Sequence, residues 1–317
     1  MMVAVCFLAP WLPRVAGWLD RWLVVAVLAV AALGMAWPAP ARVAVAHHGI
    51  SAALIVLVAA TGFGLPAGAL RQARAAAGRV LAALAVGVLV LPILAYATSR
   101  LVSPGPLRLG VLAAGVAPSE VASVALAVLA GGQAAVTVAV VAGSTLVCVL
   151  AAGLQLHLLA GGAAFSTAGL VGTLTLIVGL PLVAGVVASR AVSHCRGVAA
   201  EPVATAAATG AVLLLIWLVA GQVRLNGRYL EAAFALMIFL AGSTAAGALV
   251  GLNLPRERVV SLLLPVAMRD FAIAAGIAAA AFGPAASAPL GIYGVLVLLF
   301  GASAARLVKP RDAPERP

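Results

Sequence analysis

Long uncharged, predominantly apolar runs separated by short arginine-containing segments dominate the pattern along the chain. From Val121 to Ser189 the sequence contains no Asp, Glu, Lys or Arg, and shorter runs of this kind recur on both sides. A helix needs about 20 apolar residues to cross the hydrocarbon core of a bilayer. Steps rich in glycine divide the longest runs, at Gly131–Gly132, Gly161–Gly162 and Gly283–Pro284. The pattern therefore predicts an all-α integral membrane protein.

Two of these runs are too short to cross a bilayer alone, and each is followed directly by another short apolar piece. They are Leu109–Ser119 and Val259–Met268, and their continuations end near Ala130 and Phe282. Joining each pair into one interrupted crossing gives ten transmembrane helices. The predicted crossings cover residues 22–40, 48–68, 79–98, 105–130 (interrupted), 134–157, 166–189, 204–222, 230–251, 256–282 (interrupted) and 288–306.

The basic residues between the crossings predict the orientation of the chain. With the N-terminus inside, thirteen Lys and Arg residues fall on the inner side and five on the outer side, which agrees with the positive-inside rule. The five outer residues are Arg42, Arg100, Arg108, Arg224 and Arg228. We therefore expect a multi-pass protein of the inner (plasma) membrane with both termini in the cytoplasm.

Composition supports this class and excludes others. The chain is 65% hydrophobic and only 9% charged, whereas about 25% of the residues in a typical soluble domain are charged. These values exclude a soluble enzyme, a secreted disulfide scaffold and a nucleic-acid-binding domain. The net charge of +11 is explained by the orientation signals, so the lipid bilayer and not nucleic acid is the expected partner.

The two interrupted crossings are the fourth and the ninth, which makes them equivalent members of two five-helix halves. Five helices in each half turn the second half upside down relative to the first. We expect one transmembrane domain over residues 1–317, built of inverted repeats at about 15–160 and 161–310. Paired interruptions at corresponding positions indicate the binding site of a secondary transporter, because a broken helix must line protein or a water-filled cavity.

Three ionisable residues lie at the predicted interruptions, at mid-membrane depth. Glu120 belongs to the first interruption, and Arg269 and Asp270 belong to the second. A charge inside the membrane is a candidate functional residue because it costs about 3 kcal/mol or more. A second interpretation stays open, in which Arg269 forms a structural ion pair with Glu120 or Asp270.

These residues resemble the bile acid:sodium symporter family over most of the chain. The resemblance includes Trp18–Trp22 near the start, Gly62–Leu65 at the end of the second crossing, and the segment from Ala117 to Ser123. It continues through Gly132, Thr137 and Ser144–Leu146 to the segment Met268–Gly276. The family has ten transmembrane helices, of which the fourth and ninth are broken and cross at their middles, and the resemblance implies this fold here.

In that family, polar residues at the crossing coordinate two sodium ions. Pro118, Ser123, Thr137 and Met268 agree with the family pattern in residue type and position. The other corresponding positions differ: two glycines are replaced by Ser119 and Glu120, side-chain oxygens are lost at Val124, Val141 and Pro265, and Arg269 and Asp270 stand at the glutamine and asparagine positions. The resemblance and the charges together give seven candidate residues for substrate or ion binding, namely Ser119, Glu120, Ser123, Thr137, Met268, Arg269 and Asp270.

The substitutions suggest how the mechanism differs from sodium coupling. Arg269 places a fixed positive charge where an ion binds in the family, so we hypothesise that its guanidinium replaces a cation and attracts an anionic substrate. Glu120 or Asp270 would then bind and release protons. No bound cofactor or metal is expected, and Na⁺ or H⁺ remains as the coupling ion.

The sequence therefore predicts a secondary transporter, not an enzyme, that moves a small organic anion by alternating access. Three alternatives stay open: a membrane sensor that keeps a transporter fold, an arsenite exporter of related fold, and an intramembrane enzyme that uses Glu120 and Asp270. Neither interrupted crossing contains a cysteine, and the chain lacks a Gly-x-Gly-Asp protease element.

Overall fold

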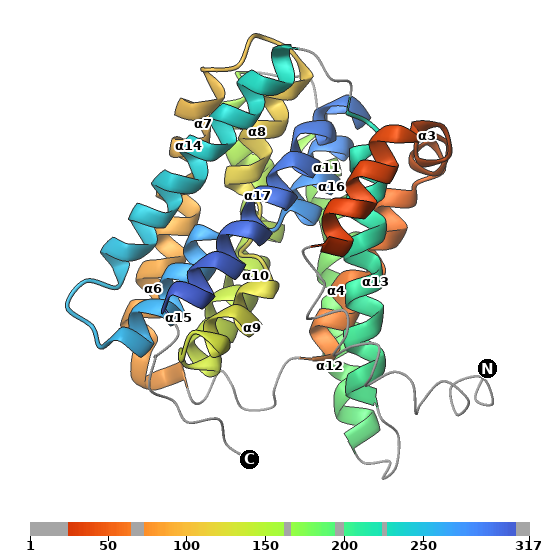
Figure 1. Cartoon of the computed structure of the whole chain (residues 1–317). Helices are drawn as coiled ribbons and strands as arrows, with labels where there is room; N and C mark the ends of the chain where they lie inside the picture. Colours follow the sequence, from red (N-terminus) through yellow and green to blue (C-terminus); the bar gives the residue numbers. More distant parts are fainter. Residues whose placement is uncertain (1–24, 65–72, 162–165, 194–199, 224–226, 309–317) are drawn as a thin grey trace.

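The computed structural model describes residues 25–64, 73–161, 166–193, 200–223 and 227–308, and these form an all-helical bundle (Figure 1). A helix at Val25–Ala36 precedes the labelled elements. The labelled α-helices are α3 (Pro38–Ala46), α4 (Gly49–Phe63), α6 (Ala77–Ala85), α7 (Leu91–Ser99), α8 (Pro106–Val116), α9 (Ala122–Leu129), α10 (Ala134–Leu159), α11 (Thr167–Leu174), α12 (Leu180–Ser193), α13 (Ala200–Ala220), α14 (Gly227–Val250), α15 (Arg256–Ala267), α16 (Phe271–Phe282) and α17 (Pro284–Val308). Helical structure satisfies each backbone group within its own segment, as a bilayer requires.

Six of the described helices are long and apolar enough to cross a membrane, and the bent pair Val25–Ala36 and α3 brings the number to seven. Three shorter apolar helices, α4, α8 and α16, fall below that length. The chain is therefore a multi-pass membrane protein. The count of ten crossings and the inverted repeat stay predictions.

The helices form two groups that lie side by side in Figure 1. In one group α4 packs against α12 and α13, and α3 contacts α13. The other group holds α6 to α10 and α14 to α17, with close pairs α7–α8, α14–α15 and α16–α17. The α4–α12 pair approaches closely because Gly62 faces the carbonyl oxygen of Leu182 and Gly185 faces that of Ala59, so a Cβ at either glycine would collide with the opposite backbone.

One predicted boundary is wrong. The first crossing was expected at residues 22–40 with a loop after it, but the helix ends at Ala36 and the chain turns by 88° into α3. Pro38 is the cause, because it begins α3 and cannot continue the preceding helix. The predicted outer loop is thus largely helical. The motif Trp18–Trp22 lies outside the described residues.

Two π-helical segments interrupt long helices, and proline explains both. The segments are Val86–Val90, between α6 and α7, and Thr175–Gly179, between α11 and α12. Each is followed by a leucine and then a proline, Pro92 or Pro181, whose ring would clash with the carbonyl four residues earlier in an α-helix. At the first segment the Val88 carbonyl accepts a hydrogen bond of 2.7 Å from Gln155 of α10.

Candidate functional site

Two breaks in the helical structure meet at the centre of the larger helix group. The first separates α8 from α9 at residues 117–121, and the second separates α15 from α16 at residues 268–270. Ser119 and Arg269 form an antiparallel β-bridge between them. The Glu120 N–H donates to the Met268 carbonyl at 2.9 Å, and the Asp270 N–H donates to the Pro118 carbonyl at 2.8 Å. Each break therefore satisfies backbone groups that the other leaves free.

Proline and its neighbours explain why the helices stop here. Ala117 has an extended backbone because it precedes Pro118, and this ends α8. Pro265 lies inside α15 and cannot donate to the carbonyl of Ser261 four residues earlier. The Thr137 hydroxyl donates to that Ser261 carbonyl at 3.1 Å. Thr137, predicted as a ligand, therefore replaces the backbone hydrogen bond that Pro265 cannot make within α15.

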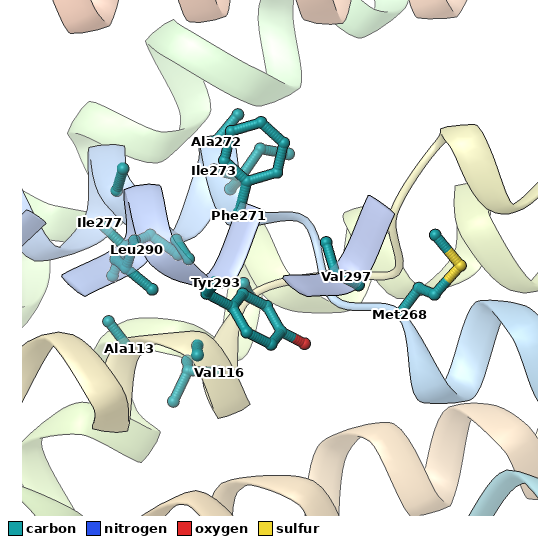
Figure 2. Packing of buried hydrophobic residues seen from close by; sticks show 14 of the residues in the cluster. Ala113, Val116, Met268, Phe271, Ala272, Ile273, Ile277, Leu290, Tyr293 and Val297 are labelled. Carbon is teal, nitrogen blue, oxygen red and sulfur yellow. The ribbon is translucent and has the colours of Figure 1, made fainter. Parts of the chain in front are cut away.

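Hydroxyl groups from neighbouring helices hold the remaining polar backbone atoms of the breaks. The Ser144 hydroxyl in α10 accepts the Ser119 N–H at 2.9 Å, and the Ser243 hydroxyl in α14 donates to the Ala267 carbonyl at 2.9 Å. The Tyr293 hydroxyl in α17 accepts the Arg269 N–H at 3.3 Å. Figure 2 shows this hydroxyl directed toward the segment that carries Met268. Sequence reasoning missed Ser243 and Tyr293, because a single hydroxyl in an apolar helix forms no motif.

Asp270 serves as the N-cap of α16. One carboxylate oxygen accepts the N–H groups of Ala272 at 3.0 Å and Ile273 at 2.8 Å. This places a negative charge at the positive end of the helix dipole. Ser123 has a comparable local role, since its hydroxyl donates to the Glu120 carbonyl at 2.6 Å.

Glu120 is buried but poorly satisfied. Its side chain is 4% exposed, and one carboxylate oxygen accepts the Ala122 N–H at a long distance of 3.4 Å, with the N–H groups of Val121 and Phe271 also near the carboxyl group. The other oxygen, Oε2, has no hydrogen-bond partner. A buried carboxylate oxygen without a donor is costly in its charged form, which makes Glu120 a candidate for proton exchange or ligand binding.

Arg269 is the second incompletely satisfied charge. Its side chain is 3% exposed, its Nη2 donates to the Gly87 carbonyl at 3.5 Å, and its Nε has no partner. A cavity of about 10 Å³ adjoins it, which is enough for roughly one water molecule. The cavity is lined by Leu84, Gly87, Val88, Val116, Ser144, Val147, Cys148, Gln155 and Arg269.

No ion pair within 4 Å joins Arg269 to Glu120 or Asp270, although all three residues lie in the described part of the chain. The structural ion pair considered from the sequence is therefore absent. The reason is geometric: the Asp270 carboxylate faces the start of α16, whereas the guanidinium extends to the π-helical segment at Gly87. Gly87 permits this approach, because a Cβ there would lie 3.2 Å from Nη1.

The seven candidate residues thus divide into two sets. Ser119, Glu120, Ser123, Met268, Arg269 and Asp270 meet at the two breaks. Thr137 instead contacts α15 at Ser261. Met268 contributes its backbone carbonyl, while its side chain is fully buried against Gly301 of α17.

A model of the sodium bile acid symporter family matches residues 51–233, more than half of the chain. The chain belongs to this family. The matched region runs from α4 into α14 and includes the first break but not the second. No curated protein gives a significant match. Members of this family are transporters, and this class is the functional context of the two breaks.

Three positions that the family resemblance relates to sodium binding carry no side-chain oxygen in this chain. Sodium binding requires several oxygen ligands, but Val124, Val141 and Pro265 offer no side-chain oxygen. The Val141 carbonyl already accepts the hydroxyl groups of Ser144 and Thr145, each at 2.9 Å. Within the described residues there is also no group of three or more His, Cys, Asp or Glu side chains arranged to hold a metal ion.

The capping role of Asp270 predicts how its replacement changes the stability of the fold. Replacing Asp270 with Ala leaves two buried N–H groups without an acceptor, which should lower the free energy of unfolding by about 1–3 kcal/mol. Asp270→Asn keeps an oxygen in place and should stay close to the wild type. Thermal unfolding in a neutral detergent measures both variants. Equal losses in the two variants would show that the charge of Asp270, and not its cap, stabilises the fold.

Proposed function

We propose that this member of the sodium bile acid symporter family is a secondary transporter of a small organic anion. The observation that carries the proposal is the buried Arg269 guanidinium, which has a free Nε and no carboxylate within 4 Å. Asp270 attracts this guanidinium electrostatically but makes no direct contact with it, so buried donors of Arg269 stay unused and favour the approach of an anion. Arginine suits this task because its planar donors match a carboxylate or a related anion.

Arg269 acts in the proposal as a tethered cation. The family name refers to sodium, and in this chain a fixed charge lies at the breaks while side-chain oxygens are lost at Val124, Val141 and Pro265. A permanent positive charge would attract the anion without a bound metal ion. Sodium coupling is therefore dispensable in this mechanism.

Glu120 is the proposed proton carrier. Asp270 is committed to the start of α16 through two N–H groups, whereas Glu120 has one oxygen without any partner. The other titratable groups that interact electrostatically with Glu120 are Asp270 and Tyr293. With Glu120 protonated, Arg269 and Asp270 leave the breaks electrically neutral, which favours movement through the membrane.

Transport follows from movement of the two helix groups against each other. In the proposed topology the chain makes ten crossings as two inverted five-helix repeats in the inner membrane, with both termini in the cytoplasm. Crossings one, two, six and seven form a panel, to which α4, α12 and α13 belong. The remaining crossings form the core that carries the two breaks. The proposal is supported by the direct packing of α4 on α12 and α13, and by the breaks lying in the other group.

Replacing Arg269 tests the anion site directly. Arg269→Gln should reduce uptake into proteoliposomes to the level of empty liposomes for every member of a panel of radiolabelled mono- and dicarboxylates, because the attracting charge is lost. Arg269→Lys should retain part of the activity. The exposed Arg258, changed to Gln, is the control with the same loss of charge. Unchanged uptake by Arg269→Gln would refute the proposed role, and uptake by no variant, wild type included, would favour a sensor.

Sodium dependence separates a tethered cation from a bound one. A ligand that binds only the folded protein stabilises it by about 2.7 kcal/mol at a hundredfold excess over Kd. We expect no difference between NaCl and choline chloride in thermal unfolding of the purified protein. A sodium-specific rise in Tm would mean that backbone carbonyls and the remaining hydroxyls still build a cation site, and that Arg269 does not replace the ion.

Proton coupling is tested at Glu120. An inwardly directed proton gradient should stimulate uptake by the wild type, and Glu120→Gln should remove the stimulation because the amide cannot exchange a proton. Asp270→Asn keeps the helix cap and leaves Glu120 as the exchanging group, so the stimulation by the gradient should persist, while total uptake should fall because the breaks then carry a net positive charge when Glu120 is protonated. The ratio of uptake with and without the gradient measures the effect. If the stimulation is lost in Asp270→Asn and kept in Glu120→Gln, the roles of the two carboxyl groups are the reverse of those proposed.

A further inference from the structure

A larger cavity lies away from the breaks, where α7 and α10 end and α8 begins. It has a volume of about 310 Å³, which is near the lower limit of typical small-molecule sites. Arg100, Pro104 and Gly161 on its lining are exposed, so the cavity can be entered from outside the protein. By the predicted topology this is the outer end of the molecule, at the top of Figure 1.

Two arginine side chains line this cavity. Neither the Arg100 nor the Arg108 guanidinium makes a hydrogen bond or an ion pair with any described residue. The Arg100 guanidinium lies over the Tyr96 ring, 5.8 Å from its centroid, which orients the charge. Glu231 does not line the cavity, and its carboxylate instead accepts the Ser103 N–H at 2.8 Å.

The backbone adds to the positive potential of this cavity. Gly105 lines it and is the N-cap of α8, and no side chain caps that helix. The first N–H groups of a helix carry a partial positive charge and bind anions. The two arginine side chains and the start of α8 thus provide donors on the same cavity.

Apart from Ser99 and Tyr96, the remaining side chains of the lining are apolar. Leu109, Leu112 and Leu159 line the cavity together with Pro104. A ligand that satisfies both parts needs an anionic group for the arginines and an apolar body for the leucines. An inorganic anion would leave the leucines uncovered, and a neutral hydrocarbon would leave the arginines unpaired.

This cavity and the small cavity at Arg269 lie on the same helices. Both are lined by the α6–α7 span, by α8 and by α10. On α8, Leu112 lines the outer cavity and Val116 lines the inner one. On α10, Leu159 lines the outer cavity and Gln155 lines the inner one. About one helical turn therefore separates the two cavities on each helix. The outer cavity therefore lies next to the inner one along these two helices, on the outer side of Arg269 in the predicted topology.

We infer that Arg100 and Arg108 form a second binding site, for an amphipathic organic anion that carries a carboxylate, sulfate or phosphate group. The binding itself is independent of the proposed transport. Its use as the capture site for the transported anion rests on the proposed function. The same chemistry is offered by a free organic anion and by the headgroup of an anionic phospholipid, and the experiment distinguishes them.

Thermal unfolding in a neutral detergent tests the site. Octanoate should raise Tm, and octyltrimethylammonium, with the same chain and the opposite charge, should not. The double variant Arg100→Gln/Arg108→Gln should lose the octanoate shift, with the apparent Kd rising about tenfold or more. Because neither guanidinium has a hydrogen-bond partner in the described structure, the ligand-free Tm of this variant should match the wild type.

Three comparisons make the result specific. Arg258→Gln, an equal loss of charge at the opposite end of the larger helix group, should keep the shift, and Ala160→Phe, which fills the cavity without changing charge, should lose it. Comparing Arg269→Gln with Arg100→Gln/Arg108→Gln assigns the shift to the proposed transport site or to this cavity. A shift lost in Arg269→Gln but kept in Arg100→Gln/Arg108→Gln would overturn the inference, as would no shift with any anion.

The source of the anion follows from a parallel titration with dioctanoyl phosphatidylglycerol and dioctanoyl phosphatidylcholine. If only phosphatidylglycerol raises Tm, and the effect requires Arg100 and Arg108, the site holds a lipid headgroup. If octanoate acts in the same way, the site also takes a free anion. A rise with phosphatidylglycerol that survives in Arg100→Gln/Arg108→Gln contradicts the assignment.

Discussion

The requirement that every backbone group in a bilayer finds a partner determines the centre of this protein. A helix that stops inside a membrane protein exposes N–H and carbonyl groups that lipid cannot satisfy. Here each break pairs with the other, through Glu120 to Met268 and Asp270 to Pro118. The two breaks are thus one structural unit, because each supplies the backbone partners of the other. These backbone hydrogen bonds fix the positions from which the charged side chains of Glu120, Arg269 and Asp270 extend.

Proline organises the rest of the polar framework in the same way. Pro265 frees the Ser261 carbonyl, which Thr137 takes up, and Pro92 follows the π-helical segment whose Val88 carbonyl accepts the Gln155 amide. In both cases the defect in one helix becomes a polar contact with α10. This helix therefore links the α6–α7 span to α15. Its side chains also line both cavities.

Much of this architecture could be predicted from the sequence, because membrane helices are marked by length and by the absence of charge. The two breaks were predictable because Pro118 and Pro265 stand beside the ionisable residues Glu120, Arg269 and Asp270 in otherwise apolar runs. The turn at Trp37 was not predicted, since a proline between apolar residues does not reveal whether a helix kinks or ends. The missing ion pair was not predictable either. Residues 269 and 270 are neighbours in sequence, but an extended backbone at a break directs their side chains to different helices.

The contact between Gly87 and Arg269 also has a consequence for the reach of the charge. A Cβ at position 87 would lie 3.2 Å from the guanidinium, so any larger residue there would require Arg269 to withdraw by a few tenths of an ångström. The missing side chain at position 87 thus lets the guanidinium extend to the backbone of the π-helical segment and donate to the Gly87 carbonyl. Position 87, on a different helix, therefore helps to set where the positive charge of Arg269 lies.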